Sequence, residues 1–113
     1  MKILIVDDEP AMRDLLKDMM ERFGVDEVFE SATGQDAIKR FQSVDLDILF
    51  LDYYLPDMNG KEVLEKIDRG KTRIVVMTGV AENDTKEECM KAGADEYLVK
   101  PFSMGDLRKL IKP

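Results

Sequence analysis

The sequence has a single cysteine, no long apolar run and no excess of positive charge, and each of these absences excludes a class of protein. Cys89 has no second cysteine with which to form an internal disulfide. No apolar run approaches the roughly 20 residues that span a bilayer. Acidic residues begin at Asp7, too early for a signal peptide. We therefore expect a soluble, cytoplasmic protein without membrane insertion.

The charge balance and the length of the chain bear on its binding partners and on the number of domains. Asp and Glu number 24 and Lys and Arg number 17, so that the net charge is -7. This charge opposes non-specific attraction to nucleic acid, and we expect no direct contact with nucleic acid. A chain of 113 residues is long enough for one core without disulfides or structural metals. Residues 1–113 are therefore expected to form a single domain.

Short apolar segments bounded by turn-forming residues are typical of β-strands, and the sequence has five of them. Residues 3–6 and 47–52 are almost entirely apolar up to the acidic residues at their ends, which is typical of strands buried on both faces of a parallel sheet. Residues 25–32 have a weaker alternating pattern that fits a strand at or near an edge. Two further strands are expected at residues 73–77 and 96–99.

Helical patterns follow each of these strands. After Pro10 and before Gly24, apolar residues recur with the spacing of one helix face, at Met12, Leu15, Leu16, Met19 and Phe23. Capping sequences predict three more helices, which start at Thr33 (a capping box), Asn59 and Ser103. Residues 81–92 are also expected to be helical, but few of them are apolar. This helix is therefore weakly anchored and is a candidate for a mobile element.

Five strands that alternate with five helices predict a doubly wound α/β fold, (βα)5, with a five-stranded parallel sheet. The short first unit favours the flavodoxin-like strand order 2-1-3-4-5, whose switch point lies between strands 1 and 3. In this order Asp7 and Asp8, which follow the first strand, lie beside Asp52, which ends the third.

Chemically useful groups stand at the carboxyl ends of four strands, namely Asp7 and Asp8, Asp52, Thr78 and Lys100. Three adjacent carboxylates repel one another unless a cation neutralises them, and Mg²⁺ suits carboxylates, backbone carbonyls and water. Lys100 adds a positive charge and Thr78 a hydroxyl donor. Each residue alone is more simply explained as a helix-end, surface or turn residue, but their coincidence predicts a phosphoryl-transfer site. A carboxylate such as Asp52 can accept a phosphoryl group covalently.

The sequence resembles the receiver domain of two-component response regulators in four ordered motifs. They are VDDEP at 6–10, LDYYLPDMNG at 51–60, MTG at 77–79 and GADEYLVKPF at 93–102. The resemblance covers effectively the whole chain and implies the CheY-like (βα)5 fold. It also implies that Asp52 accepts a phosphoryl group from a histidine kinase or phosphotransferase in a phosphorelay.

The same resemblance implies the ligands of the metal. Asp8 and Asp52 would bind Mg²⁺ through their side chains and Tyr54 through its backbone carbonyl, while Asp7 would act through a water molecule. A cis Lys100-Pro101 bond and a shortened third helix, within residues 59–71, are also expected.

The resemblance further implies how the signal arises and leaves. Thr78 and Lys100 would hold the phosphoryl oxygens, and Tyr97 would be the switch aromatic that turns inward when Thr78 moves. The expected output surface comprises the helix at 81–92, the fifth strand and the last helix, and it would bind a downstream target, an output domain or a second copy in a phosphorylation-dependent dimer. Kinase docking is expected near the first helix, with Met12, Leu15 and Leu16, although such a Met/Leu stripe is more typical of a core.

Two positions bear on how long a phosphate would persist. In receivers the residues two beyond the acceptor and two beyond the threonine flank the path of the hydrolytic water, and here they are Tyr54 and Val80. Neither side chain positions water as an acid or amide does, so we expect slow self-dephosphorylation with Tyr54 partly shielding the acyl phosphate. The alternative, in which Tyr54 simply packs over the loop, is equally compatible with the sequence.

Two further functions are compatible with parts of the sequence. A hydrolase of the haloacid-dehalogenase type also uses a strand-end Asp and Mg²⁺, but it requires a second Asp at the position occupied by Tyr54. A pseudo-receiver that is never phosphorylated is disfavoured by the complete set of site residues. We therefore expect no enzyme activity beyond the chain's own phosphorylation and dephosphorylation. Because the sequence ends at residues 110–113, where the last expected helix ends, with no DNA-binding or catalytic module attached, we expect either a stand-alone relay protein or a part of a longer regulator.

Overall fold

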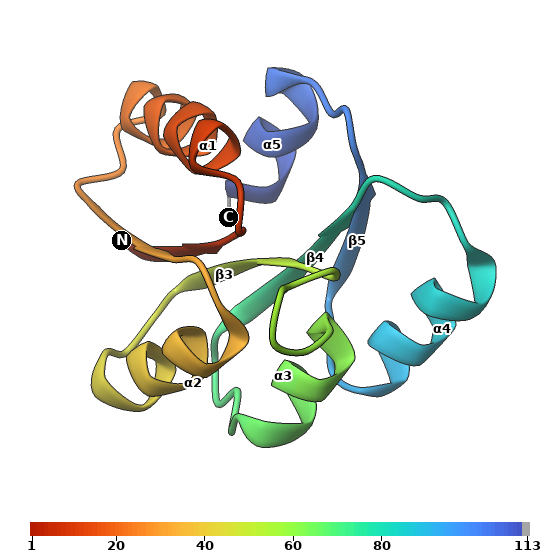
Figure 1. The fold of residues 1–113 in the computed structure, drawn as a ribbon. Coiled ribbons are helices and arrows are strands. Elements are labelled where there is room, and N and C mark those ends of the chain that lie inside the picture. The colour runs from red at the N-terminus through yellow and green to blue at the C-terminus, as the bar shows by residue number, and fades with distance from the viewer. Residues whose placement is uncertain (112–113) are drawn as a thin grey trace.

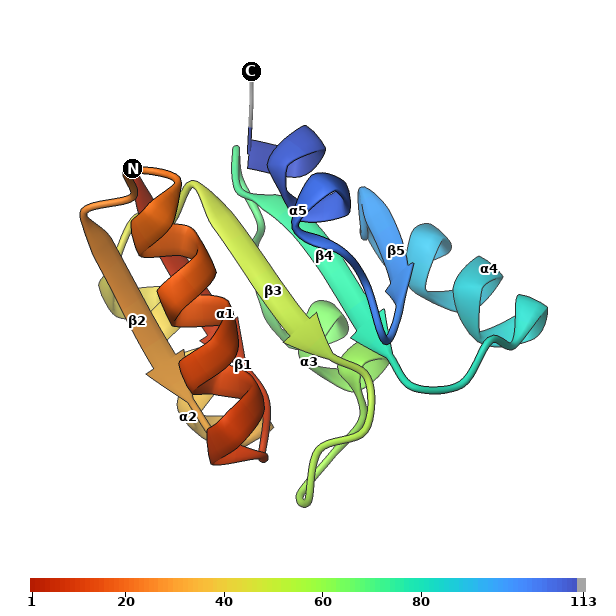
Figure 2. The same cartoon turned by 90° about the horizontal axis from the view of Figure 1, so that it is seen from above.

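The computed structural model of the protein describes residues 1–111 and shows one parallel sheet flanked by helices on both faces (Figures 1 and 2). The strands are β1 (Lys2–Val6), β2 (Glu27–Ser31), β3 (Ile48–Asp52), β4 (Arg73–Thr78) and β5 (Glu96–Val99). Their spatial order is β2-β1-β3-β4-β5, and every neighbouring pair is parallel. The predicted fold class and strand order are confirmed. Lys112 and Pro113, which the expected domain and chain end include, lie outside the described residues.

The five helices form two layers. They are α1 (Pro10–Arg22), α2 (Gly34–Ser43), α3 (Gly60–Lys66), α4 (Asn83–Lys91) and α5 (Met104–Ile111). Helices α1 and α5 cover one face of the sheet, and α2, α3 and α4 cover the other (Figure 1). Among residues 1–111, no helix combines the length and the apolar character that crossing a membrane requires.

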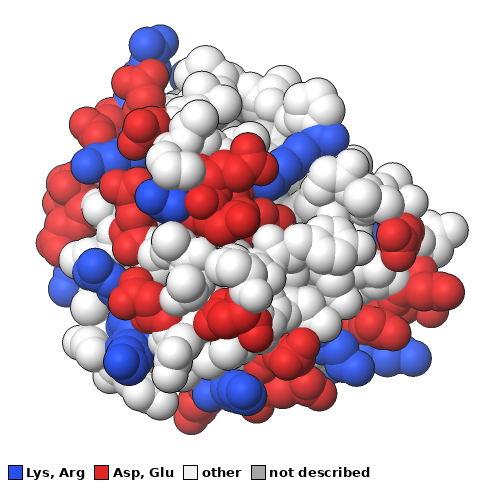
Figure 3. All heavy atoms as spheres, in the orientation of Figure 1, with Lys and Arg blue, Asp and Glu red and all other residues white. Residues whose placement is uncertain are grey.

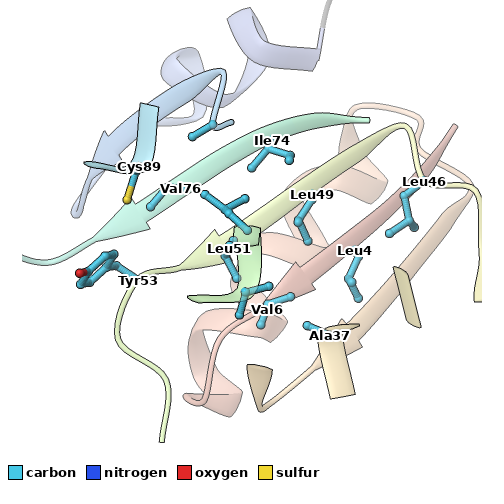
Figure 4. Close-up of a cluster of buried hydrophobic side chains, with 13 residues drawn as sticks. Leu4, Val6, Ala37, Leu46, Leu49, Leu51, Tyr53, Ile74, Val76 and Cys89 are labelled. Atoms are coloured by element: carbon cyan, nitrogen blue, oxygen red, sulfur yellow. The ribbon is translucent and has the colours of Figure 1, made fainter. Parts of the chain in front are cut away.

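Two apolar cores lie on the two faces of the sheet because successive strand residues point to opposite sides. In β1, Ile3 and Ile5 join the core under α1 and α5, whereas Leu4 and Val6 join the core under α2, α3 and α4. Figure 4 shows strand side chains of the second core from β1, β3 and β4, namely Leu4, Val6, Leu49, Leu51, Ile74 and Val76. Because these strands are buried on both faces, their sequences are continuous apolar runs.

The helix N-caps at Asn59 and Thr33 agree with those predicted from the sequence, with one difference. Asn59 forms a complete capping box with Glu62 at the start of α3, which has only seven residues. At α2, the Thr33 hydroxyl accepts a hydrogen bond from the Asp36 amide, but the Asp36 carboxylate accepts one from the Ser31 hydroxyl at 2.6 Å. The expected capping box at Thr33 is thus only half formed, because a nearer donor engages the Asp36 side chain.

The expected apolar face of α1 is wrong at one position. Leu15 is 46% exposed, whereas Leu16 and Met20 are completely buried, and Met20 was not among the expected residues. Met12 and Met19 are only partly buried against the same core. The helix therefore presents a face centred on Leu16 and Met20, which are four residues apart and lie one above the other. Leu15 falls at the edge of this face.

Candidate functional site

The carboxyl ends of β1, β3, β4 and β5 meet at one edge of the sheet, and the expected site residues lie along it. Each pair of neighbouring strands is in register close to this edge, with Val6 beside Leu51 and Thr78 beside Val99. Carboxylate oxygens of Asp7, Asp8 and Asp52 lie within 4.8 Å of one another. In Figure 3 a compact group of acidic side chains lies close to the start of α1.

Asp7 is completely buried, and both of its carboxylate oxygens have partners. One oxygen accepts a hydrogen bond from the Glu9 amide at 2.9 Å, and the other lies 2.8 Å from Nζ of Lys100. The backbone of Asp7 is held as well, because its amide donates to the Ser31 carbonyl and its carbonyl accepts from Arg13. Asp7 is thus fixed by neighbours from several elements, while the adjacent Asp8 is exposed to solvent.

Asp52 ends the central strand with only 5% of its surface exposed. One carboxylate oxygen lies 3.4 Å from the Tyr54 amide, and the other lies 3.5 Å from Nζ of Lys100. Burial raises the pKa of Asp52 to about 6; the Asp7 charge acts in the same direction, and the Lys100 charge opposes it. At neutral pH the carboxylate is therefore mainly ionised.

Lys100 bridges the two buried carboxylates. Its side chain is only 14% exposed, and its backbone amide donates to the Thr78 carbonyl at 2.7 Å. Burial lowers the pKa of Lys100, but the hydrogen bond to Asp7 and the charges of Asp52 and Asp7 outweigh it and raise the pKa above its ordinary value. The ammonium therefore stays protonated. The Lys100-Pro101 bond is cis, as expected.

Thr78 and Tyr97 both contact the backbone of Val80. The buried Thr78 hydroxyl accepts a hydrogen bond from the Val80 amide at 3.2 Å, and the Tyr97 hydroxyl lies 3.5 Å from the Val80 carbonyl. The half-buried Tyr97 ring packs against the core under α2, α3 and α4. A single backbone residue after β4 thus connects the expected switch pair.

Tyr54 lies two residues after Asp52, beyond the end of β3. Its side chain is 50% exposed and meets the Tyr53 ring edge to face, with ring centroids 4.9 Å apart. Val80, the other residue expected to flank the path of water, is 46% exposed. Both side chains are therefore accessible at the surface.

The donor set fits a hard divalent cation. Three carboxylates with oxygens within 4.8 Å of one another are opposed by Lys100, the basic residue whose ammonium lies within ion-pair distance of Asp7 and Asp52. The cluster therefore carries a negative excess in a partly buried place, and all of its donor atoms are oxygens. This chemistry suits Mg²⁺, which prefers carboxylate oxygens and retained waters.

Two residues close to this edge were not predicted from the sequence. Arg13 donates to the Asp7 carbonyl at 2.7 Å and lies 3.4 Å from the Glu30 carboxylate. Asp57 accepts hydrogen bonds from the amides of Gly34 and Gln35. Arg13 falls on the polar side of an expected helix and Asp57 in an expected turn, so neither pattern indicates a partner.

Comparisons with known proteins show the family of the chain. A family model described as response regulator receiver domain matches residues 3–112. The chain belongs to this family. Its receiver domain is 32% identical over 103 residues to the chemotaxis protein CheY of Thermotoga maritima, an alignment that covers 89% of this chain and 86% of CheY.

One further relative and one solved structure are also similar to this chain. It is 40% identical over 103 residues to the transcriptional regulatory protein SrrA of Staphylococcus aureus, and the match covers 90% of this chain but only 42% of SrrA. Among solved structures, the receiver domain of the sensor histidine kinase PA1611 of Pseudomonas aeruginosa has a TM-score of 0.85 and 27% identity. That alignment covers 96% of this chain and 92% of the PA1611 chain, and the PA1611 structure has a magnesium ion coordinated in the active-site cleft.

Proposed function

We propose that this receiver accepts a phosphoryl group on Asp52 from a histidine kinase or phosphotransferase, and that Mg²⁺ held by Asp8, Asp52 and the Tyr54 carbonyl supports the transfer. The observation that carries the proposal is the placement of Asp52. It is a buried, mainly ionised carboxylate on the central strand, with Lys100 on one side and two further carboxylates within 4.8 Å. Membership of the receiver family and the magnesium ion in the PA1611 receiver support it.

In the proposed reaction an Asp52 carboxylate oxygen attacks the phosphorus atom. The new oxygen–phosphorus bond forms as the bond to the donor's nitrogen or oxygen breaks, and that bond's electron pair leaves with the donor. Lys100, which Asp7 holds at 2.8 Å, places its ammonium beside the phosphoryl oxygens, and Thr78 supplies a hydroxyl donor. Asp7 would act on the metal only through a water molecule. When bound, Mg²⁺ would neutralise the charge of the carboxylates and phosphoryl oxygens.

The proposed output begins at Thr78. The negative charge of a phosphoryl group attracts the hydroxyl away from the Val80 amide, and Tyr97, which shares Val80 as a partner, then shifts inward. Helix α4 lies between these residues in sequence and buries only Thr85 and Cys89. The surface formed by α4, β5 and α5 is therefore the face that we propose binds a target, an output domain or a second copy.

The proposed kinase contact lies on α1. Of the three residues considered from the sequence, Leu16 is completely buried and belongs to the core, whereas Leu15 is exposed. Leu15 is therefore the α1 residue that we expect to contact a kinase. We also propose that residues 1–113 act as one receiver unit whose only chemistry is its own phosphorylation and dephosphorylation.

Incubation with Mg²⁺ and acetyl phosphate, followed by intact-mass measurement, tests the function. We expect the wild type to gain one phosphoryl group, Asp52→Ala to gain none, and the exposed control Asp45→Ala to behave as the wild type. Chelation of Mg²⁺ should abolish the gain. A wild type that gains no mass would indicate a pseudo-receiver, and an undiminished gain in Asp52→Ala would place the reaction elsewhere. Turnover of a generic phosphate ester would instead favour a hydrolase.

A further inference from the structure

The loop that follows the acceptor strand is attached to the start of α2 by Asp57. Its two carboxylate oxygens accept hydrogen bonds from the first two amides of the helix, at 2.8 Å from Gly34 and 2.9 Å from Gln35. These amides have no partners within the helix, and a carboxylate at a helix N-terminus is favoured by charge. Although desolvation raises it, the hydrogen bonds from these amides bring the pKa of the exposed Asp57 below its ordinary value. The carboxylate is therefore charged at neutral pH.

The next residue of the loop also rests on α2. A side-chain carbon added at Gly34 would lie 2.4 Å from Cγ and 2.7 Å from Sδ of Met58. The absence of a side chain at Gly34 is thus what allows Met58 to sit against the helix, where it packs on the core. Asp57 and Met58 together fasten the tip of the loop at one place.

The loop itself is a closed turn, so its tip determines where its first leg lies. Tyr54 pairs with Asn59 in an antiparallel bridge, the Leu55 amide donates to the Met58 carbonyl at 3.2 Å, and the Gly60 amide donates to the Tyr53 carbonyl at 2.7 Å. The Tyr54 side chain is half exposed, and its ring contacts that of the preceding residue, Tyr53. The position of the Tyr54 backbone therefore depends on the tip.

The first turn of α2 is also connected to the other side of the site. Asp36 accepts a hydrogen bond from the Ser31 hydroxyl at 2.6 Å, and the Ser31 carbonyl accepts one from the Asp7 amide at 3.1 Å. One helix end is thus linked directly to the loop that follows Asp52 and, through Ser31, to the Asp7 backbone. It can hold them at a fixed separation.

We propose that Asp57 is a positioning residue for the metal site: by fastening the loop to α2, it sets the Tyr54 carbonyl at the distance from Asp7 and Asp8 that Mg²⁺ requires. The inference rests on the proposed function, because it concerns the same cation. Asp57 does not contact the cation in this proposal and acts only through the loop. Outer residues that orient metal ligands alter metal affinity by roughly 10- to 100-fold in metalloproteins generally.

Two substitutions, one in the loop and one at the N-cap of α2, separate this role from ordinary helix capping. Asp57→Ala removes the two hydrogen bonds that attach the loop, whereas Thr33→Ala removes the local cap of the same helix, a 3.1 Å bond to the Asp36 amide, and leaves those two bonds in place. Mg²⁺ binding to the unphosphorylated proteins is measured by titration calorimetry, and hydrogen exchange is followed at the Leu55 and Gly60 amides. Asp57→Asn, which keeps one acceptor oxygen, serves if Asp57→Ala does not fold.

We expect Asp57→Ala to weaken Mg²⁺ binding by about 10-fold and to speed exchange at both amides. Asp57→Asn should fall between it and the wild type, and Thr33→Ala should lower the melting temperature but bind Mg²⁺ within about twofold of the wild type. If the wild type binds Mg²⁺ and is phosphorylated, two results would overturn the inference but not the proposed function. One is an equal weakening of Mg²⁺ binding in Asp57→Ala and Thr33→Ala, and the other is unchanged Mg²⁺ binding in Asp57→Ala. A wild type that binds no Mg²⁺ would overturn the proposed function together with the inference.

Discussion

The ammonium of Lys100 lies 2.8 Å from a carboxylate oxygen of Asp7, a residue with no exposed surface and 93 positions away in the chain. The same ammonium lies 3.5 Å from Asp52. A buried charge that loses its partner is strongly destabilising, because its desolvation is no longer compensated by the lost ion pair. The stability of the fold and the proposed chemistry of the site therefore depend on the same lysine.

Replacement of Lys100 should reveal this dependence. We expect Lys100→Ala to lower the free energy of unfolding by about 3 kcal/mol in metal-free buffer. The loss should be smaller in excess Mg²⁺, because a bound cation offsets part of the carboxylate charge. Urea denaturation with and without Mg²⁺ measures both values, with the exposed Lys91→Ala as control. Equal losses in the two buffers would contradict the proposed location of the cation.

Because the pKa of Asp52 is raised, we expect replacement of its carboxyl group to stabilise the fold by an amount that depends on pH. The folded-state pKa is about 6 and the unfolded value is about 3.9, so the folded state holds the proton more tightly and ionisation of Asp52 destabilises the fold above pH 6. In metal-free buffer, Asp52→Asn should therefore increase stability at pH 7 to 8 by up to about 3 kcal/mol. The gain should diminish as the pH falls through 6 and vanish near pH 4. Denaturant titrations across this range check it, and a pH-independent gain would point to another cause.

The side chains at Tyr54 and Val80 predict a long-lived phosphoryl group. Both side chains are about half exposed, and neither carries an acid or amide that could position a water molecule for attack. We expect Tyr54→Asn and Val80→Glu to shorten the half-life of the phosphorylated protein, by a factor on the order of 10. The decay of the phosphorylated mass after removal of the donor gives the rate. Unchanged decay in both variants would favour the alternative in which Tyr54 only packs over the loop, beside Tyr53.

Cys89 provides a probe of the proposed output face. Burial raises the pKa of this thiol to about 11, so a thiol reagent should modify it mainly when α4 opens. Because α4 buries only Thr85 and Cys89, we expect labelling to be faster than global unfolding and its rate to change on phosphorylation. Labelling with and without acetyl phosphate measures the change, and Asp52→Ala should show none. A rate equal to that of global unfolding would exclude a mobile α4.

The strands and the strand-end residues could be predicted from the sequence because both depend on local patterns. Continuous apolar runs mark strands buried on two faces, and the strand order then places Asp7, Asp8 and Asp52 together. The expected face of α1 was less accurate. Leu15 and Met20 exchange their expected burial because a helical pattern alone does not define how far the helix is rotated against the sheet.

The attachment of Asp57 to α2 could not be predicted for a related reason. It joins residues 22 and 23 positions apart, and its existence depends on how closely the loop approaches the helix. The absent side chain at Gly34 permits this approach, but glycine also occurs at the start of helices that no loop approaches. Similarly, the pairing of Asp36 with Ser31 rather than with its own cap depends on the docking of α2 against β2.

The distance along the chain between Asp7 and Lys100 has a consequence for protein synthesis. A chain emerges from the ribosome with its N-terminal end first, so β1, β2 and β3 are available to pair long before residue 100 is made. Throughout that time the Asp7 and Asp52 carboxylates lack their cation, and a sheet closed around them would be destabilised. We therefore expect the fold to be completed only after β5 has been made, so that the proposed phosphorylation site forms no earlier than that point.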